Sequence, residues 1–281
     1  MAYCCFVGLK KRGAIHATLS GSPRNQSNDI LMEERFKEII FGRHPVLDAI
    51  QSGATVDKVM LQEGVRGDFE KELRHACKAS QIPLLVVPKE RFTKWVKGAN
   101  HQGVLAFISP IAFHKLEEVL PGIFERGETP LFLVLDGITD VRNFGAIART
   151  AEVCGAHALI VPRKNTAWIN AEAMKASAGA LNRIPVCRES SLVVALELLQ
   201  QSGVHVLASD LQAESYLFDL DFSVPVALVL GSEGEGISPA ISKKADTTFK
   251  IPQKGLTDSF NVSVAAGIML YEVLRQRWAA G

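Results

Sequence analysis

Five side chains able to do chemistry lie in three short stretches, each of which follows an apolar run typical of a strand. They are Asn143, Arg149, Glu233, Ser259 and Asn261. Amides, hydroxyls and carboxylates orient polar ligands by hydrogen bonds, and the guanidinium of arginine matches the geometry of a phosphate. Polar residues at the ends of strands in an α/β sheet occupy the usual position of a site. The pattern therefore indicates a site built from segments far apart in the sequence.

Each of these residues also has a purely structural explanation. Asn143, Ser259 and Asn261 are residue types that cap the first turn of a helix, and a helix is expected close after each of them. Glu233 could be a solvated acid in a glycine-rich turn, and Arg149 could be a surface arginine. Asn143 and Arg149 do not have the i,i+4 spacing of one helix face. Taken one at a time, these residues do not identify an active site.

The glycine-rich loop that holds Glu233 reads GSEGEGIS. Its glycines, Gly231, Gly234 and Gly236, have the spacing G-x-x-G-x-G, whereas a dinucleotide-binding loop needs G-x-G-x-x-G. The lysine of a phosphate-binding P-loop is missing as well. The loop is therefore not one of the standard nucleotide-binding loops.

Residues 131–281 alternate between strand and helix patterns, which predicts an α/β fold. Leu131–Leu135 and Val224–Leu230 are continuous apolar strands of the buried, parallel type. A last strand at Thr248–Ile251 precedes a proline, and small and apolar residues recur at helical spacing from Asn261 onward. Between these segments we expect strands at Ala158–Val161, Ile184–Val186 and Val204–Ala208, and helices at about Gly145–Val153, Ala171–Gly179 and Leu192–Gln201.

Residues 36–110 are predicted to form a smaller α/β domain, with strands at Val56–Leu61, Pro83–Val87 and Gly103–Ile108 and helices at Phe69–Ala79 and Lys89–Lys97. The last of these helices interleaves cations with Phe92 and Trp95, and cations beside flat rings suit the phosphates and unpaired bases of RNA. The alternative is an ordinary amphipathic helix that buries both rings and solvates its charges. The candidate RNA-binding residues of this domain are Arg43, Lys89, Arg91 and Lys94.

The remaining segments have little to fold around. Residues 1–35 are basic, rich in serine and free of acids before Asp29, which predicts a flexible extension. The alternatives are a transit peptide and a stretch that precedes a true start at Met32. Residues 111–130 contain two prolines and two glycines and are interpreted as a linker with one weak helix around Leu116–Leu120.

Composition bounds the class of protein. The 281 residues are 47% apolar and 22% charged, as in a soluble globular protein of about two domains. The net charge is only +1, so any RNA site must be a local patch. Five cysteines without zinc-ligand spacing predict free thiols, no metal, and a reducing compartment such as the cytoplasm. No apolar run approaches the ~18 residues of a membrane span, so no membrane partner is expected.

Three motifs, taken together, carry a resemblance to a known family. The segment from Asp136 to Arg149 fits D-G-x-x-D-x-x-N-x-G-x-x-x-R, and Gly231–Gly236 fits G-x-E-x-x-G. Ile251-Pro252 followed by SFNVSVA from Ser259 supplies the third. In this order and at this spacing they closely resemble the SpoU/TrmH class of ribose 2′-O-methyltransferases. GRHPVLDAI and HQGVLAFI, at the head and tail of the smaller domain, resemble the L30e-like RNA-binding domain that precedes the catalytic domain in many of these enzymes.

The resemblance implies a SPOUT fold, in which the C-terminal segment passes through a loop to make a deep trefoil knot, and it implies a homodimer. S-adenosylmethionine would bind at the knot, against Leu230, Gly231, Ile251, Leu256 and Phe260. Phe260 replaces the leucine usual in the family, and the residue after Ile-Pro, Gln253, replaces an apolar one.

The implied reaction is methylation of the 2′-oxygen of a guanosine in the peptidyl-transferase P loop of 23S ribosomal RNA. Arg149, reaching in from the partner subunit, would act as base or as phosphate clamp. Asn143, Glu233, Ser259 and Asn261 would orient it, the ribose and the cofactor. A guanosine of transfer RNA and another ribosomal site are alternative substrates. A noncatalytic RNA-binding factor for ribosome assembly is the alternative from a different class.

Overall fold

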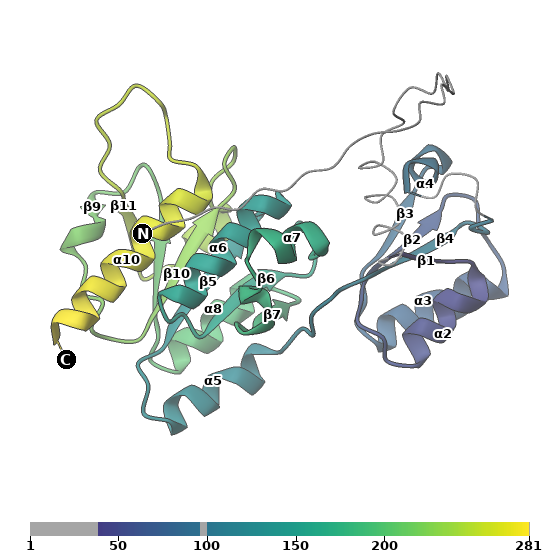
Figure 1. Cartoon of the computed structure of the whole chain (residues 1–281), viewed down its shortest axis with the longest axis horizontal. Coiled ribbons are helices and arrows are strands. Elements are labelled where there is room, and N and C mark those ends of the chain that lie inside the picture. The colour runs from purple at the N-terminus through teal and green to yellow at the C-terminus, as the bar shows by residue number, and fades with distance from the viewer. Residues whose placement is uncertain (1–38, 96–99, 281) are drawn as a thin grey trace, which may run out of the picture.

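Two sheets, joined by one connecting segment, organise the chain in the computed structural model (Figure 1). The structure describes residues 39–95 and 100–280, so the predicted extension over residues 1–35 lies outside the described residues. We call the four-stranded sheet with its helices the N-terminal unit, and the seven-stranded sheet with its helices the C-terminal unit.

The N-terminal unit is a mixed sheet in the order β1-β4-β2-β3, in which β4 is antiparallel to both neighbours and β2 is parallel to β3. Side chains alternate across it, as the period of a strand requires. Val59 and Leu61 pack beneath α2 and α3, whereas Met60 points to the opposite face. Its elements are β1 (Ile39–Phe41), α2 (Arg43–Gln51), β2 (Val56–Gln62), α3 (Asp68–Ala79), β3 (Leu84–Val87), α4 (Lys89–Trp95) and β4 (Val104–Ile108).

The C-terminal unit begins with α5 (Leu116–Glu125), β5 (Leu131–Asp136), α6 (Val141–Val153), β6 (Ala158–Pro162), α7 (Ala171–Ala176), a 3-10 turn (Ala180–Asn182), β7 (Val186–Glu189) and α8 (Leu192–Gln201). It continues with β8 (His205–Ser209), β9 (Ser215–Tyr216), a 3-10 turn (Leu217–Asp219), β10 (Val226–Gly231), α9 (Pro239–Ser242), β11 (Thr247–Lys250) and α10 (Val262–Ala280). The sheet order is β7-β6-β5-β10-β8-β11-β9, and each neighbouring pair is parallel.

Helices cover both faces of this parallel sheet, which explains why its strands are apolar throughout. Leu133 and Leu135 belong to the core shared with α6 and α10, whereas Phe132 and Val134 belong to the core shared with α5 and α8. Because all pairs are parallel, the carboxyl ends of β5, β8, β10 and β11 meet at one edge of the sheet, which we call the carboxyl edge.

The start of α6 corrects one structural explanation of Asn143. The helix begins at Val141 rather than near Gly145, and its N-cap is Asp140. The Asp140 carboxylate accepts a hydrogen bond from the backbone N–H of Asn143 at 2.8 Å. Asn143 therefore lies in the first turn of the helix, and its side chain is free for another role.

Close packing between α6 and α7 explains why small residues, Gly145 on one helix and Ala173 and Ala176 on the other, face each other. A Cβ atom on Gly145 would lie 2.6 Å from Cβ of Ala176 and 2.7 Å from the carbonyl oxygen of Ala173. The helix α7 ends at Ala176, earlier than the predicted Gly179, because Ala178 and Gly179 adopt positive φ angles of 48° and 81°.

Other element boundaries also differ from the prediction. The strand expected at Ile184–Val186 is β7, which starts only at Val186. The helix expected in the linker extends to Glu125, and its buried face lies in the core of the C-terminal unit. The short elements β9 and α9 were not predicted, because segments this short show no periodicity.

The described cysteines are free thiols, as predicted: Cys77, Cys154 and Cys187. Burial raises the pKa of Cys77 to about 11 and, as the largest cause, that of Cys187 to about 12, so both thiols stay protonated at neutral pH. Cys4 and Cys5 lie outside the described residues. Over residues 39–95 and 100–280, no helix is both long and apolar enough to cross a membrane, and no cluster of three potential metal ligands occurs.

Candidate active site

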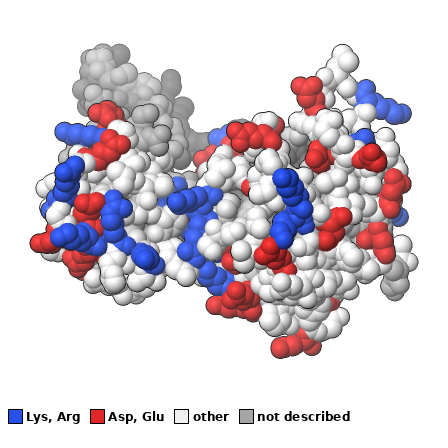
Figure 2. All heavy atoms as spheres, turned by 180° about the vertical axis from the view of Figure 1, so that it is seen from behind, with Lys and Arg blue, Asp and Glu red and all other residues white. Residues whose placement is uncertain are grey.

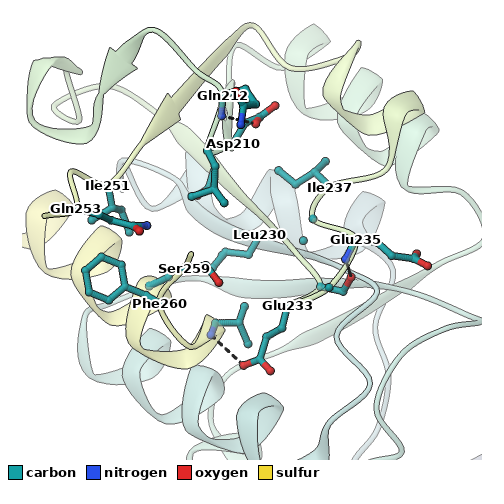
Figure 3. A pocket seen from close by; sticks show the side chains of 18 residues that line it. Asp210, Gln212, Leu230, Glu233, Glu235, Ile237, Ile251, Gln253, Ser259 and Phe260 are labelled. Carbon is teal, nitrogen blue, oxygen red and sulfur yellow. Dashed lines mark hydrogen bonds between the residues drawn. The ribbon is translucent and has the colours of Figure 1, made fainter. Parts of the chain in front are cut away.

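A cavity of about 400 Å³ opens at the carboxyl edge of the C-terminal unit (Figure 3). Three loops enclose it: the loop after β8, the glycine-rich loop after β10, and the segment between β11 and α10. Ile251, Gln253 and Phe260 form one side, and Ile237 stands opposite. A cavity of this size and mixed polarity suits a small ligand with apolar and polar parts.

Hydrogen bonds unite one residue from each of the three motifs beside this cavity. Oε1 of Glu233 accepts from Nδ2 of Asn261 at 2.6 Å and from Nδ2 of Asn143 at 3.2 Å. Nδ2 of Asn261 also lies 3.1 Å from Oδ1 of Asn143. The backbone N–H of Val262, at the start of α10, donates to the same Glu233 oxygen at 3.3 Å. We call these three side chains, Asn143, Glu233 and Asn261, the polar triad.

Asn261 also stabilises the first turn of α10. Its Oδ1 accepts from the backbone N–H of Ser263 at 3.0 Å and from the Ser263 hydroxyl at 2.6 Å. Its capping explanation is therefore correct, but capping uses only Oδ1, while Nδ2 serves the polar triad. Ser259 is exposed and lines the cavity.

The glycine-rich loop folds back on itself so tightly that no side chain fits at its start. Ser232 and Gly236 exchange two backbone hydrogen bonds of 3.0 Å. A Cβ atom on Gly231 would lie 2.0 Å from the carbonyl carbon of Gly236. At the end of β5, Oδ2 of Asp136 accepts from the backbone N–H of Ser238 at 2.8 Å and holds the far end of the loop. Three glycines of this loop, Gly231, Gly234 and Gly236, therefore contribute only backbone to the lining of the cavity.

Four of the five predicted cofactor contacts line the cavity: Leu230, Gly231, Ile251 and Phe260. Leu256 does not, because it is fully exposed at the tip of a loop whose residues from Pro252 to Asn261 are all exposed. The loop after β8, which no sequence motif marked, also brings Asp210 and Gln212 to the cavity (Figure 3). Only the central position of β8 beside β10, which the sequence does not reveal, would have pointed to it.

Arg149 stands apart from the other candidate catalytic residues. It is exposed on α6 and does not line the cavity. In the part of the chain that the structure describes, its guanidinium has no hydrogen-bond or ion-pair partner. Within one chain, the structure thus brings together Asn143, Glu233, Ser259 and Asn261 but not Arg149.

Two of the predicted RNA-binding cations, Arg43 and Lys89, line a groove of about 500 Å³ in the N-terminal unit. The groove also has polar walls from Asn100, His101 and Gln102. On the face shown in Figure 2, basic side chains extend from the N-terminal unit across the junction of the two units, with acidic ones between them. The side chains of Arg91 and Lys94 lie outside the described part of the structure.

The aromatic residues of α4 are packed, as the amphipathic-helix alternative predicts. Phe92 is fully buried and stacks on the ring of His101 at a centroid distance of 4.9 Å. Trp95 packs edge-on against Phe107 at 5.0 Å. Neither ring is therefore a free platform for a base.

Comparison with known proteins agrees with this geometry. The sequence model of the SpoU rRNA Methylase family matches residues 130–271, and that of the RNA 2′-O ribose methyltransferase substrate-binding domain matches residues 39–113. The chain is 34% identical over 87% of its length to YacO of Bacillus subtilis (strain 168), whose name places it in the TrmH family of tRNA/rRNA methyltransferases, and the match covers 98% of that protein.

Two solved structures are similar to the fold. AviRb, a SpoU methyltransferase from Streptomyces viridochromogenes solved with AdoMet, has a TM-score of 0.56 at 24% identity over 92% of this chain and 100% of its own. The A. aeolicus TrmH/SpoU tRNA modifying enzyme has a TM-score of 0.51 at 32% identity over 59% of this chain and 86% of its own. The motifs, their convergence on one cavity and these matches lead to one conclusion: the chain belongs to the SpoU/TrmH family and is an RNA 2′-O-ribose methyltransferase.

Proposed function

We propose that this enzyme transfers the methyl group of S-adenosylmethionine to the 2′-oxygen of a guanosine in the peptidyl-transferase P loop of 23S ribosomal RNA. The observation that carries the proposal is the polar triad, which ties the three family motifs together beside a cavity of about 400 Å³. The matched substrate-binding region in residues 39–113 favours a large, structured RNA over the transfer RNA alternative.

The cavity fits the proposed cofactor in size and chemistry. Leu230, Ile251 and Phe260 offer apolar contacts for an adenine ring, and the backbone at Gly231 can satisfy its polar edge. Leu256 would join them once the exposed loop folds over the ligand. AviRb, which has the same fold, was solved with AdoMet, which supports the assignment. When bound, the cofactor supplies a methyl group on a sulfonium sulfur.

The residues around the cavity then have two tasks. The 2′-oxygen must be held in line with the methyl group at about 3 Å, because such alignment provides much of the rate. Glu233, Asn143 and Asn261 form a rigid hydrogen-bonded frame for this, and Ser259 faces the cavity from the loop before α10. The hydroxyl must also lose its proton, for which no group of the polar triad other than the Glu233 carboxylate could serve as acceptor.

We assign Arg149 to the neighbouring active site of a homodimer. An apolar surface beside the cavity supports the dimer: Phe218, Val264, Tyr271 and Trp278 are all exposed, and a second hollow of about 530 Å³ lies among the first three of them. A guanidinium has a pKa above ~12 and is a poor base, so we favour a clamp on the phosphate next to the target ribose.

Further features of the family complete the proposal. We infer a deep trefoil knot in the C-terminal unit, an L30e-like fold for the N-terminal unit, and domains at residues 36–110 and 131–281. Of the connecting residues 111–130, the helix α5 packs on the second domain. The return of α10 against α6 and β10, next to the cavity, is consistent with the knot. Free, protonated thiols fit a reducing cytoplasm.

The test is transfer of labelled methyl from S-adenosylmethionine to unmodified 23S ribosomal RNA and, separately, to unmodified transfer RNA, followed by mapping of the modified ribose. We expect label at one guanosine of the P loop. Label in transfer RNA alone would overturn the substrate and keep the reaction. Label in neither RNA, with cofactor bound, would favour the noncatalytic assembly factor.

Replacing Arg149 tests its assigned role. Arg149→Ala should reduce methyl transfer by about 10³-fold, as expected for loss of a charged transition-state contact, and leave cofactor affinity unchanged. Arg142→Ala is the matched control. Arg142 lies on the same helix and, among the described residues, pairs only with the exposed Glu172, with Nε 2.6 Å from the carboxylate oxygen. Undiminished turnover of the Arg149 variant would exclude both the clamp and the base.

A further inference from the structure

A tryptophan of the C-terminal unit is built into the core of the N-terminal unit. Trp168 lies in the loop between β6 and α7, and only 8% of its surface is exposed. Its ring meets Phe107 edge-on at a centroid distance of 4.8 Å and Trp95 at 5.7 Å. Among the described residues, it is the one member of this cluster that the N-terminal unit does not supply itself.

A buried ion pair joins the same two units nearby. Arg188 of β7 donates from Nη1 to the carbonyl oxygen of Asp57 in β2 at 3.0 Å, and from Nη2 to the Asp57 carboxylate. Both residues are buried, with 8% and 5% of their surfaces exposed. The guanidinium also stacks on the ring of Phe113, in the connecting segment, at 3.3 Å from its centroid. A charge pair withdrawn from water in this way tolerates little change of geometry, since separating it leaves a buried charge.

Backbone hydrogen bonds connect this interface to the active site. The N–H of Ala167, next to Trp168, donates to the carbonyl oxygen of Ile138 at 2.8 Å. Ile138 lies in the first motif, between Asp136 and Asn143 of the polar triad. The N-terminal unit is thus docked on a loop that is itself hydrogen-bonded to the first motif.

We propose that Trp168 and Arg188 are positioning residues, which fix the N-terminal unit in one orientation so that RNA held by it presents one ribose to the cavity. The proposal rests on the RNA-methyltransferase activity and on RNA binding by the N-terminal unit. Units joined by a short chain segment move relative to one another unless contacts between them hold them in place. Here the buried indole of Trp168, the Arg188–Asp57 ion pair and a hydrogen bond from Arg163 to the side chain of Gln81 supply that restraint. The interface therefore decides which nucleotide is methylated.

The test uses the full-length enzyme and whichever RNA the methyl-transfer experiment identifies as substrate. Trp168→Ala should raise KM for this RNA at least tenfold, change kcat at saturating RNA by less than threefold, and spread methylation to neighbouring riboses. Trp168→Phe keeps an aromatic ring in the cluster, so this variant should retain the KM and the single modified position of the unaltered enzyme. Calorimetric affinity for S-adenosylmethionine should be equal in all three proteins and serves as the check on folding.

A second variant covers the case in which Trp168→Ala fails to fold. Asp57→Asn combined with Arg188→Gln removes both charges of the pair together, and it should broaden the modified positions in the same way. The ammonium of Lys58, which lies 3.8 Å from the Asp57 carboxylate, is partly exposed to water. Unchanged KM and an unchanged single position in the folded variants would overturn the proposal. A fall in kcat with KM unchanged would also overturn it, because the contact would then act on the motif and not on RNA placement. Absence of methylation by the unaltered enzyme would instead contradict the proposed substrate.

Discussion

The two edges of the parallel sheet in the C-terminal unit use polar side chains in opposite ways. At the carboxyl edge, Asn143, Glu233 and Asn261 bond chiefly to one another. At the opposite edge, where the strands begin and which we call the amino edge, Arg277 of α10 donates to four backbone carbonyl oxygens that precede β5 and β10. The donor–acceptor distances are 2.9 Å to Phe222, 2.8 Å to Thr129, 2.9 Å to Pro130 and 3.0 Å to Val224.

The difference separates stability from function along one sheet. A bond to the backbone is fixed once the strands are in place, so the amino edge locks α10 to the sheet. The side chains of the polar triad hold one another in place beside the cavity, where a bound ligand depends on their geometry more than the sheet does. We therefore expect changes at the amino edge to act on unfolding, and changes at the carboxyl edge to act on binding and rate.

The largest exception to this division should be Gly231→Ala, which we expect to reduce both cofactor binding and stability. The added Cβ would overlap the carbonyl group of Gly236, so the hairpin at the cavity floor must open. We expect loss of S-adenosylmethionine binding and a decrease of about 2–3 kcal/mol in the free energy of unfolding, as for other overpacked sites. Calorimetry and denaturant unfolding measure the two.

Gly234→Ala is the control for this change, three residues away in the same loop. A Cβ atom there meets nothing within 4 Å. It should leave the free energy of unfolding unaltered, and stability is the quantity compared because Gly234 also lines the cavity. Equal effects of the two substitutions would mean that the loop tolerates no side chain anywhere, and that the close approach at Gly231 is not the reason.

At the amino edge, Arg277→Ala should destabilise the protein without changing its active site. Four carbonyl oxygens lose a charged donor, and we expect the free energy of unfolding to fall by about 3 kcal/mol, given that each such bond contributes roughly 1.5–3 kcal/mol but not additively. Cofactor affinity of the folded fraction should stay the same.

Arg275→Ala is the matched control, two residues away on the same helix. Arg275 is exposed and, among the described residues, pairs only with Glu272, at 2.7 Å in the i,i+3 position, so its loss should cost less than about 0.5 kcal/mol. A variant at Arg277 that kept its stability but lost cofactor binding would contradict the division between the two edges.

At the carboxyl edge, Glu233→Gln should lower the rate of methyl transfer while leaving stability nearly unchanged. The amide oxygen can still accept from Asn143 and Asn261, so we expect the free energy of unfolding to change by less than about 1 kcal/mol. The lost charge weakens these bonds, and kcat/KM should fall about 10–100-fold, or roughly 1.4–2.7 kcal/mol in the barrier. Asp258→Asn, an exposed acid outside the cavity lining, should have no effect.

The contrast between the edges also explains what the sequence could and could not predict. Asn143, Glu233 and Asn261 were identifiable because each lies in a short motif whose spacing can be read in the sequence and resembles that of a known family. Asp210 was not, because its place beside the cavity depends on β8 pairing with β10, a non-local choice with no signal in either segment. Trp168 was passed over for the same reason, since its partners belong to the other unit.

Leu256 illustrates a different limit of sequence reasoning. Its place in the motif predicted a wall of the cofactor cavity, but the loop from Pro252 to Asn261 is exposed throughout. None of the residues that the structure describes covers that leucine, and a contact that depends on a bound ligand leaves no trace in the packing. Arg149 is the corresponding case for the contact that we propose with a second subunit.

The smallest expected effect comes from pH at the amino edge. Nδ1 of His157 accepts a hydrogen bond from the backbone N–H of Leu131 at 3.0 Å, and Nε2 lies 3.2 Å from the Glu128 carboxylate. Both contacts are satisfied by the neutral ring with its proton on Nε2, whereas protonation of Nδ1 would break the bond to Leu131. Burial lowers the pKa of His157, and Glu128 opposes this shift only in part.

Because this pKa is lower in the folded than in the unfolded protein, the unfolded state binds more protons as the pH decreases. Stability from His157 is therefore fully present above its unfolded pKa of about 6.5 and is lost as the pH falls below that value. Denaturant unfolding at pH 7.5 and 5.5 should show a loss in the unaltered protein that is smaller in His157→Asn, whose amide oxygen can accept from Leu131 without titrating. Cofactor affinity should follow the same course in both proteins, since the ring lies at the edge opposite the cavity. An equal loss of stability in the two proteins would assign the pH dependence to other groups.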